Sequence, residues 1–169
     1  MGKMIRSFLA RKQTALMAAL ISATALAAAF IGQYGFDLHP CTLCIYQRWP
    51  FVVAIALGLA GAIVARRHPS VFTAILVLLA LTFAADTGIA AFHVGVEQGW
   101  WQGLSSCSAE VGTAKTVEQL RAQILAAPIV RCDDIAWSLF GISMAGYNVL
   151  LCLGLAVYCA FQARRKGEE

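Results

Sequence analysis

The stretch QTALMAALISATALAAAFIGQYGF, residues 13–36, contains no Asp, Glu, Lys or Arg. Three further charge-free runs follow, at 49–65, 68–85 and 135–163. A helix needs about 20 apolar residues to cross the hydrocarbon core of a bilayer, and such runs are too long for the strands of a membrane barrel. The composition agrees, because 60% of the residues are hydrophobic and only 13% are charged. The sequence therefore predicts an all-α integral membrane protein, a bundle of four transmembrane helices.

The four expected helices form a single membrane domain over 1–169. They span about 14–34, 44–65, 70–96 and 137–162, and the longer loops between them cover about 35–43 and 97–136. In the second of these loops, TVEQL at 116–120 has a capping-box pattern, and the apolar residues after it share one helical face. We therefore expect a short amphipathic helix there, either on the membrane surface or packed on the bundle.

Basic residues predict the orientation of the helices. Most of them lie near the two termini and in the loop after the second helix, at Lys3, Arg6, Arg11, Lys12, Arg66, Arg67, Arg164, Arg165 and Lys166. The positive-inside bias then places both termini in the cytoplasm and the two longer loops outside. The net charge of +4 follows from this asymmetry and gives no reason to expect nucleic acid as a partner. The N-terminal segment also resembles a secretory signal, but its apolar stretch is longer than usual, which favours a retained helix.

Six cysteines are present, and four of them fall at or beyond the predicted outer face, at Cys41, Cys44, Cys107 and Cys132. The outer side of a bacterial inner membrane is oxidising, so these four suggest two disulfides or a redox relay. Cys107 and Cys132 have a spacing that allows a disulfide, either reactive or purely structural, and it argues against a four-cysteine zinc site. Cys152 and Cys159 share one helix, about 10.5 Å apart along its axis, so we expect them to pack as small apolar groups.

The motif PCTLCIYQR, residues 40–48, places two close thiols at the start of the second helix. The partial positive charge of a helix N-terminus stabilises a thiolate. Arg48 follows Cys44 by one helical turn, so its guanidinium can share a helix face with that sulfur. The alternative is that Arg48 only extends to the lipid headgroups.

This motif, together with Gln33, a long loop with two cysteines and CDDIAWSLFGISMAGYN at 132–148, resembles the DsbB family. Members of that family reoxidise DsbA, the periplasmic dithiol oxidase. The resemblance covers nearly the whole chain, including its four-helix topology. It implies a quinone-dependent protein-dithiol oxidoreductase of the bacterial inner membrane, which passes electrons to ubiquinone or menaquinone and so sustains disulfide formation.

The resemblance also implies a role for each outer cysteine. A Cys107–Cys132 disulfide would meet reduced DsbA, with Cys107 forming the mixed disulfide. Cys132 would pass the electrons to the Cys41–Cys44 pair. Cys44 would then engage the quinone as a thiolate, and Arg48 would support the negative charge.

Further candidates for the quinone site lie on the last two helices. Quinone reduction consumes protons, so His93 is a candidate donor, although an interfacial histidine without a role is the alternative. Met144 and Trp137 either line the quinone pocket or pack in the bundle. Asp86 follows a long apolar run, and an acid inside a membrane is a functional hypothesis unless it reaches interfacial water.

Three other functions compete with this interpretation. Enzymes similar to vitamin K epoxide reductase perform related chemistry, but their quinone-facing Cys-x-x-Cys follows the loop cysteines, whereas here it precedes them. A transmembrane thiol carrier needs reactive cysteines on separate helices, and Cys152 and Cys159 share one. A disulfide-stapled membrane assembly factor would leave Arg48 unexplained.

Overall fold

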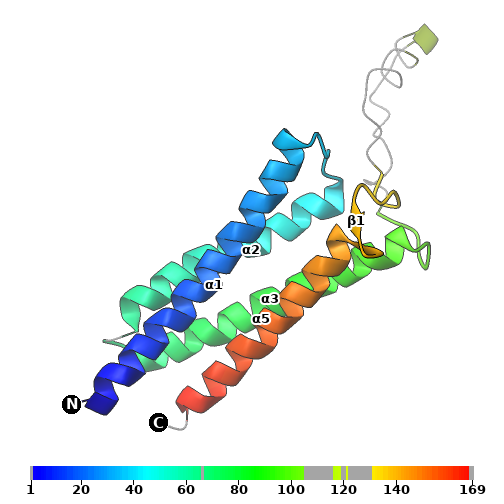
Figure 1. The fold of residues 1–169 in the computed structure, drawn as a ribbon. Coiled ribbons are helices and arrows are strands. Elements are labelled where there is room, and N and C mark those ends of the chain that lie inside the picture. The colour runs from blue at the N-terminus through cyan, green and yellow to red at the C-terminus, as the bar shows by residue number, and fades with distance from the viewer. Residues whose placement is uncertain (1, 66, 105–115, 119–120, 122–130, 168–169) are drawn as a thin grey trace.

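The computed structural model describes residues 2–65, 67–104, 116–118, 121 and 131–167. In this part of the chain four long helices form a bundle, as Figure 1 shows: α1 (Gly2–Gly35), α2 (Thr42–Val64), α3 (Pro69–Glu97) and α5 (Met144–Gly167). Each contains a span long and apolar enough to cross a membrane. The predicted fold class, an all-α membrane bundle, is confirmed.

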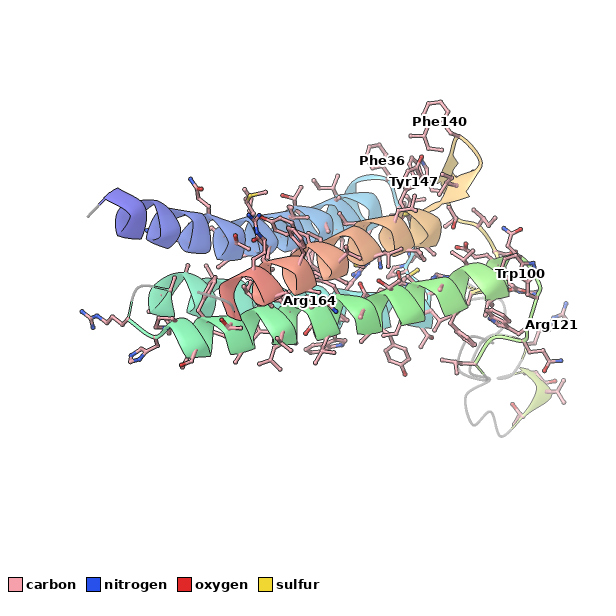
Figure 2. All side chains as sticks on the ribbon, turned by 90° about the horizontal axis from the view of Figure 1, so that it is seen from below. Phe36, Trp100, Arg121, Phe140, Tyr147 and Arg164 are labelled. Carbon is pink, nitrogen blue, oxygen red and sulfur yellow. The ribbon has the colours of Figure 1, made fainter. Side chains whose placement is uncertain are left out.

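The helices pack in chain order, with α1 on α2, α2 on α3, and α3 on α5. The start of α1 and the end of α5 lie at the same end of the bundle (Figure 1). At the opposite end, α1 and α3 finish while α2 and α5 begin; we call this the Cys41 end. Aromatic side chains mark it in Figure 2, where Trp100, Phe140 and Tyr147 lie far from Arg164. Aromatic residues of this kind favour the boundary between lipid and water.

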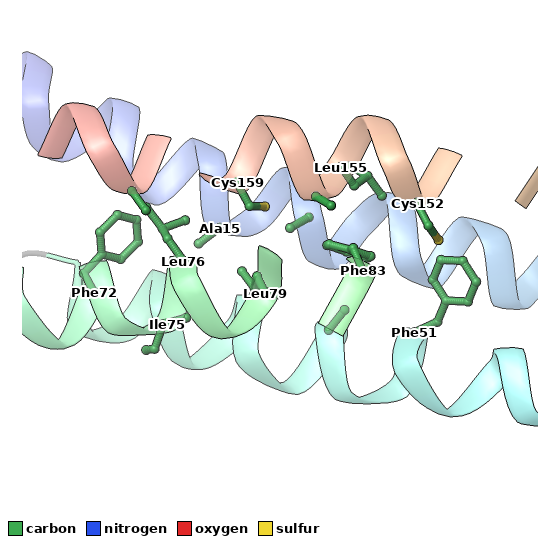
Figure 3. Packing of buried hydrophobic residues seen from close by; sticks show 14 of the residues in the cluster. Ala15, Phe51, Phe72, Ile75, Leu76, Leu79, Phe83, Cys152, Leu155 and Cys159 are labelled. Carbon is green, nitrogen blue, oxygen red and sulfur yellow. The ribbon is translucent and has the colours of Figure 1, made fainter. Parts of the chain in front are cut away.

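An apolar core runs along the bundle. Figure 3 shows its centre, where Phe72, Leu76 and Phe83 of α3 are fully buried. Around them lie residues from the other three helices, Ala15, Phe51, Cys152, Leu155 and Cys159. Both α5 cysteines are free thiols with no exposed surface. Cys159 packs in the apolar core as expected, whereas the thiol of Cys152 also donates a hydrogen bond to Asp86. The outward faces stay apolar too, as membrane helices require, with Leu20, Ile63, Leu81 and Val157 more than half exposed.

Small residues bring α1 and α2 together. A Cβ atom added at Gly58 would lie 2.7 Å from the backbone oxygen of Ala15 and 2.9 Å from the Cβ of Ala19. Apolar side chains gain no hydrophobic driving force from leaving lipid for a helix interface, so close backbone contact is a main source of attraction between membrane helices. Gly58 therefore sets the distance between these two helices.

A short β-hairpin, with two residues in each strand, replaces the expected first turns of the last helix. β1 (Ser138–Leu139) pairs antiparallel with β2 (Ile142–Ser143), so α5 begins at Met144 and not near Trp137. The turn between the strands has positive φ at Phe140 (51°) and Gly141 (77°), a backbone that no α-helix can accommodate.

The start of the second helix was also expected elsewhere. α2 begins at Thr42 and not near Cys44, because Cys41 caps the helix with its own side chain. The amphipathic helix expected after Thr116 lies largely outside the described residues and stays a prediction.

Replacing Gly58 with alanine tests the α1–α2 contact. We expect Gly58→Ala to lower the free energy of unfolding by about 1–3 kcal/mol, because the new methyl group meets backbone that cannot move aside. Unfolding by sodium dodecyl sulfate in mixed micelles measures the change. Gly154→Ala is the control, since nothing lies within 4 Å of a Cβ at that position. Equal stability of the two variants would contradict the assignment.

Candidate active site

The first turn of α2 brings the two motif thiols together. Cys41 is the N-cap residue, and its sulfur accepts a hydrogen bond from the backbone nitrogen of Cys44 at 3.3 Å. The thiol of Cys41 in turn donates a hydrogen bond to the sulfur of Cys44, with 3.1 Å between the two Sγ atoms. Both cysteines are free thiols. The local sequence thus places two hydrogen-bonded sulfurs at a helix N-terminus, whose partial positive charge favours a thiolate.

His93 of α3 supplies a third contact to the same sulfur. Its Nε2 lies 3.5 Å from the Sγ of Cys41 and 3.8 Å from Oε1 of Glu97, one turn further along α3. The other oxygen of Glu97 accepts a hydrogen bond from the hydroxyl of Ser143 at 2.5 Å. His93 is only 4% exposed, so it belongs to the site and not to the interface with water.

Cys132 packs beside this pair. Cys41, Leu43, Val96 and Cys132 form a second buried cluster at the Cys41 end, and Cys44 packs against it. Cys132 is disulfide-bonded. Cys107, the other loop cysteine predicted to react, lies outside the described residues. Three of the four cysteines singled out in the sequence are therefore close together in the structure.

The hydrogen bonds identify which sulfur of the pair carries negative charge most easily. The thiol of Cys44, the ring of His93 and the backbone of Cys44 together outweigh the effect of burial and lower the pKa of Cys41 to about 4. The sequence favoured Cys44 as the thiolate because of Arg48. These contacts favour a thiolate at Cys41 in the free pair, and the role of Cys44 as the thiolate that engages the quinone stays a prediction.

Donor atoms of Cys41, Cys44 and His93 lie within 4.8 Å of one another, a closeness that metal centres and activated thiol pairs share. The direct hydrogen bond between the two sulfurs favours the thiol pair, since it occupies the space between them. Cysteine reactivity is therefore the chemistry that this arrangement best supports.

A cavity of about 440 Å³ opens beside the thiols, a size typical of small-molecule sites. It lies between α1 and α5, and its lining includes Cys41, Cys44, Arg48, His93 and Met144, with Trp137 and Gln33 at its wall. Most of the remaining wall is apolar, including Ala25, Leu26, Ala29, Phe51 and Leu151. An apolar cavity with a few polar groups near a thiol pair can hold a hydrophobic ring compound such as a quinone.

Arg48 is fixed at the wall of this cavity by α1. Its Nη1 donates a hydrogen bond to Oε1 of Gln33 at 2.7 Å, and its guanidinium lies 4.9 Å from the centre of the Phe30 ring. A cation held over an aromatic face gains electrostatic stabilisation. These protein contacts leave Arg48 half-buried beside the cavity, which argues against a side chain that only extends to headgroups.

Two site residues were missed in the sequence. The Nε2 of Gln47 donates to Nδ1 of His93 at 2.9 Å, and the amide nitrogen of Asn148 donates to Oε1 of Gln47 at 2.8 Å. Asn148 also donates to Asp86 at 3.2 Å. The signal was available, because Asn148 is an amide within a charge-free apolar run. Asp86 is fully buried in the bundle and does not reach interfacial water.

The low pKa of Cys41 predicts an unusual pH dependence of alkylation. Thiolate is the reactive form, so the iodoacetamide rate at Cys41 should stay nearly constant from about pH 8 to pH 6 and fall only towards pH 4. An ordinary thiol loses about tenfold in rate per pH unit over that range. Mass spectrometry of the alkylated peptide gives the rate at this residue.

Replacing Cys44 tests the cause. Cys44→Ala removes the main donor and should raise the pKa of Cys41, whereas Cys44→Ser keeps a hydroxyl donor and should preserve most of the effect. An ordinary alkylation profile in the unmodified protein would contradict the assignment of the thiolate.

Comparisons with known proteins identify the family of the chain. The family model "Disulfide bond formation protein DsbB" matches residues 11–162. An uncharacterised protein of Rickettsia prowazekii (strain Madrid E) is 31% identical over 140 residues, which cover 82% of this chain and 79% of that protein.

Two relatives carry the name disulfide bond formation protein B. The one from Dechloromonas aromatica is 30% identical over 139 residues, 76% of this chain and 78% of its own. The one from Xanthomonas euvesicatoria pv. vesicatoria is 31% identical over 157 residues, 89% of this chain and 90% of its own. No solved structure matches the chain. The chain belongs to the DsbB family, membrane oxidoreductases of disulfide bond formation.

Proposed function

We propose that this protein oxidises the dithiol of a DsbA-like partner and transfers the electrons to a membrane quinone. The observation that carries the proposal is the position of the Cys41–Cys44 pair, which borders an apolar cavity on one side and packs against Cys132 on the other. A thiol pair with these two neighbours can exchange electrons with another cysteine pair and with a lipid-soluble acceptor. Family membership supports the same function.

Thiol–disulfide exchange brings electrons to the pair. A partner thiolate attacks a Cys107–Cys132 disulfide at Cys107, which frees Cys132 as a thiolate, and the second partner thiol then releases the partner as its disulfide. Cys132 attacks a Cys41–Cys44 disulfide at Cys41, next to which it packs, and Cys44 leaves as a thiolate. Attack by Cys107 on Cys132 restores the loop disulfide and leaves Cys41 and Cys44 reduced. Two electrons and two protons have then passed from the partner to the pair.

The cavity has the features that a bound quinone would need. Quinone supplies the electron acceptor, taking two electrons and two protons as the Cys41–Cys44 disulfide re-forms. Arg48 is placed to bind a ring oxygen as negative charge develops there, because Gln33 and Phe30 already hold its guanidinium at the cavity wall. His93 holds a proton within reach of Cys41, and Met144 lines the same space.

The orientation proposed for the bundle follows from the same function. Both termini face the cytoplasm of a bacterial cell, and the Cys41 end faces the periplasm, where the partner resides. The cavity then lies near the outer boundary of the inner membrane. Its position between α1 and α5 suits entry from the lipid, because α1 packs mainly on α2 and α5 mainly on α3.

Coupled oxidation tests the function directly. Purified protein in nanodiscs, mixed with reduced DsbA and a short-chain ubiquinone, should consume two thiols for each quinone reduced. Thiol titration and the ultraviolet absorbance of quinone measure the two sides. Cys44→Ala should abolish turnover, because the disulfide that returns electrons to quinone can no longer form. Cys159→Ser should retain turnover, since that buried thiol contacts only core residues. Absence of quinone-dependent thiol loss in the unmodified protein would refute the proposal.

Removing the cation at the cavity should weaken quinone binding. We expect Arg48→Met to raise the apparent KM for quinone by about 10- to 100-fold, the loss expected for hydrogen bonds from a charged group. Steady-state rates over a range of quinone concentrations separate KM from kcat.

Arg165→Met provides the matched control. Arg165 also lies over an aromatic ring, at 5.3 Å from Phe161, but at the far end of α5 from the cavity. Its substitution should leave the quinone KM unchanged. Equal KM values for the Arg48 variant and the unmodified protein would remove Arg48 from the quinone site.

A further inference from the structure

The proposed electron route leaves one buried acid without a task. Asp86 lies within α3 and has no exposed surface. Its Oδ2 accepts hydrogen bonds from Asn148 and from the thiol of Cys152, each at 3.2 Å. Its Oδ1 is buried without a partner, and no ion pair to Asp86 occurs among the described residues. A polar group in such a place is costly, so its retention calls for a compensating role.

Hydrogen bonds connect Asp86 to the redox pair without a break. Asn148 of α5 bridges Asp86 and Gln47, at 3.2 Å and 2.8 Å. Gln47 of α2 then reaches His93 of α3 at 2.9 Å, and His93 contacts the Cys41 sulfur at 3.5 Å. Apart from the half-buried Asn148, the members of this chain are each less than a tenth exposed. Water therefore competes little with the bonds between them.

Each bond in this chain fixes the direction of the next. The oxygen of Asp86 accepts, so Asn148 must present its NH₂ group. The same NH₂ group donates to Gln47, so Gln47 must present its oxygen there and turn its own NH₂ towards His93. An NH₂ group cannot accept, so Nδ1 of His93 is the acceptor. The ring proton of neutral His93 is then on Nε2, the nitrogen that faces Cys41.

We propose that Asp86 is a positioning residue for the redox pair, which acts through Asn148 and Gln47 to hold the His93 proton on Nε2, directed at the Cys41 sulfur. The inference rests on the redox role proposed for Cys41. Reversal of any amide would place two acceptors or two donors face to face. The opposite tautomer would place the lone pair of Nε2 against a thiolate and remove its third donor.

Other groups around Nε2 support the same tautomer. Glu97 of α3 presents Oε1 at 3.8 Å, and a carboxylate oxygen accepts a proton donor but repels a lone pair. The second oxygen of Glu97 is already bonded to Ser143, which holds the carboxylate in place. His93 thus has acceptors, Cys41 and Glu97, near Nε2 and a donor, the Gln47 amide, at Nδ1. Asp86 fixes the orientation of that amide through Asn148.

Removing the acceptor at position 86 tests this role. Asp86→Leu should release Asn148 and Gln47 to reorient, so that His93 loses its single tautomer and the pKa of Cys41 rises by about one unit. Asp86→Asn keeps an oxygen that can accept from Asn148, and it should preserve both properties. The pH dependence of Cys41 alkylation reports the pKa, and ¹⁵N NMR of histidine-labelled protein reports the tautomer. The chain has only three histidines, which makes the assignment practical.

Two further variants guard against a general loss of structure. Asn148→Leu interrupts the chain in its middle, so it should match Asp86→Leu, and the double variant should shift the pKa no further than either single one. Cys159→Ser is the control, because Cys159 is equally buried on α5 but belongs to the apolar core. It should leave both readouts unchanged.

Two outcomes would overturn the inference. An unchanged tautomer and alkylation profile in Asp86→Leu would reduce Asp86 to a structural group. An Asp86→Asn variant that behaves like Asp86→Leu would show that the acid proton or charge matters and not the acceptor. Neither readout needs quinone or a partner protein, so this inference can fail while coupled oxidation succeeds, and the reverse.

Discussion

The side chain of Gln47 joins three helices at the level of the redox pair. Its two amide atoms bond to His93 on α3 and to Asn148 on α5, while its backbone belongs to α2. In a bilayer these groups find no water, and each unsatisfied one costs several kcal/mol. The bundle must therefore hold the three helices in one register, or leave polar atoms unpaired. α2 otherwise contacts mainly α1 and α3, so this amide adds a polar contact between α2 and α5.

Gln47 also separates two environments within the bundle. Away from the Cys41 end the interior is a continuous apolar core around Phe72, Leu76 and Phe83. On the other side are the thiols, His93 and the cavity that extends to α1. A tightly packed core offers no room for a ligand. The cavity begins beside the thiols, where electrons are available, and extends to Phe51 at the edge of the core.

Local patterns explain what the sequence could predict. Charge-free runs specified the four helices, and the Cys-x-x-Cys motif with Arg48 identified the thiol pair and the cation, because both signals lie within a single helix. The later start of α5 could not be foreseen, since the run from 135 to 163 is free of charge throughout and the turn at Phe140 depends on a left-handed backbone. Contacts between helices could not be predicted either, because they join residues that lie far apart in the sequence. Nothing in the spacing of Gln47, Asp86 and Asn148 shows that they meet.

The two sulfurs of the motif have different surroundings, and this difference suits a relay. Cys41 is buried against Cys132 and receives hydrogen bonds from α2 and α3, so its charge is stabilised by the protein itself. Cys44 is less buried and lies one turn before Arg48, which α1 holds at the cavity wall. Under the proposed function, Cys41 carries the thiolate while neither cysteine is in a disulfide. Once Cys41 is bonded to Cys132, the charge passes to Cys44, where Arg48 and the acceptor are within reach. Exchange with a protein and transfer to a quinone are thereby assigned to separate atoms of one helical turn.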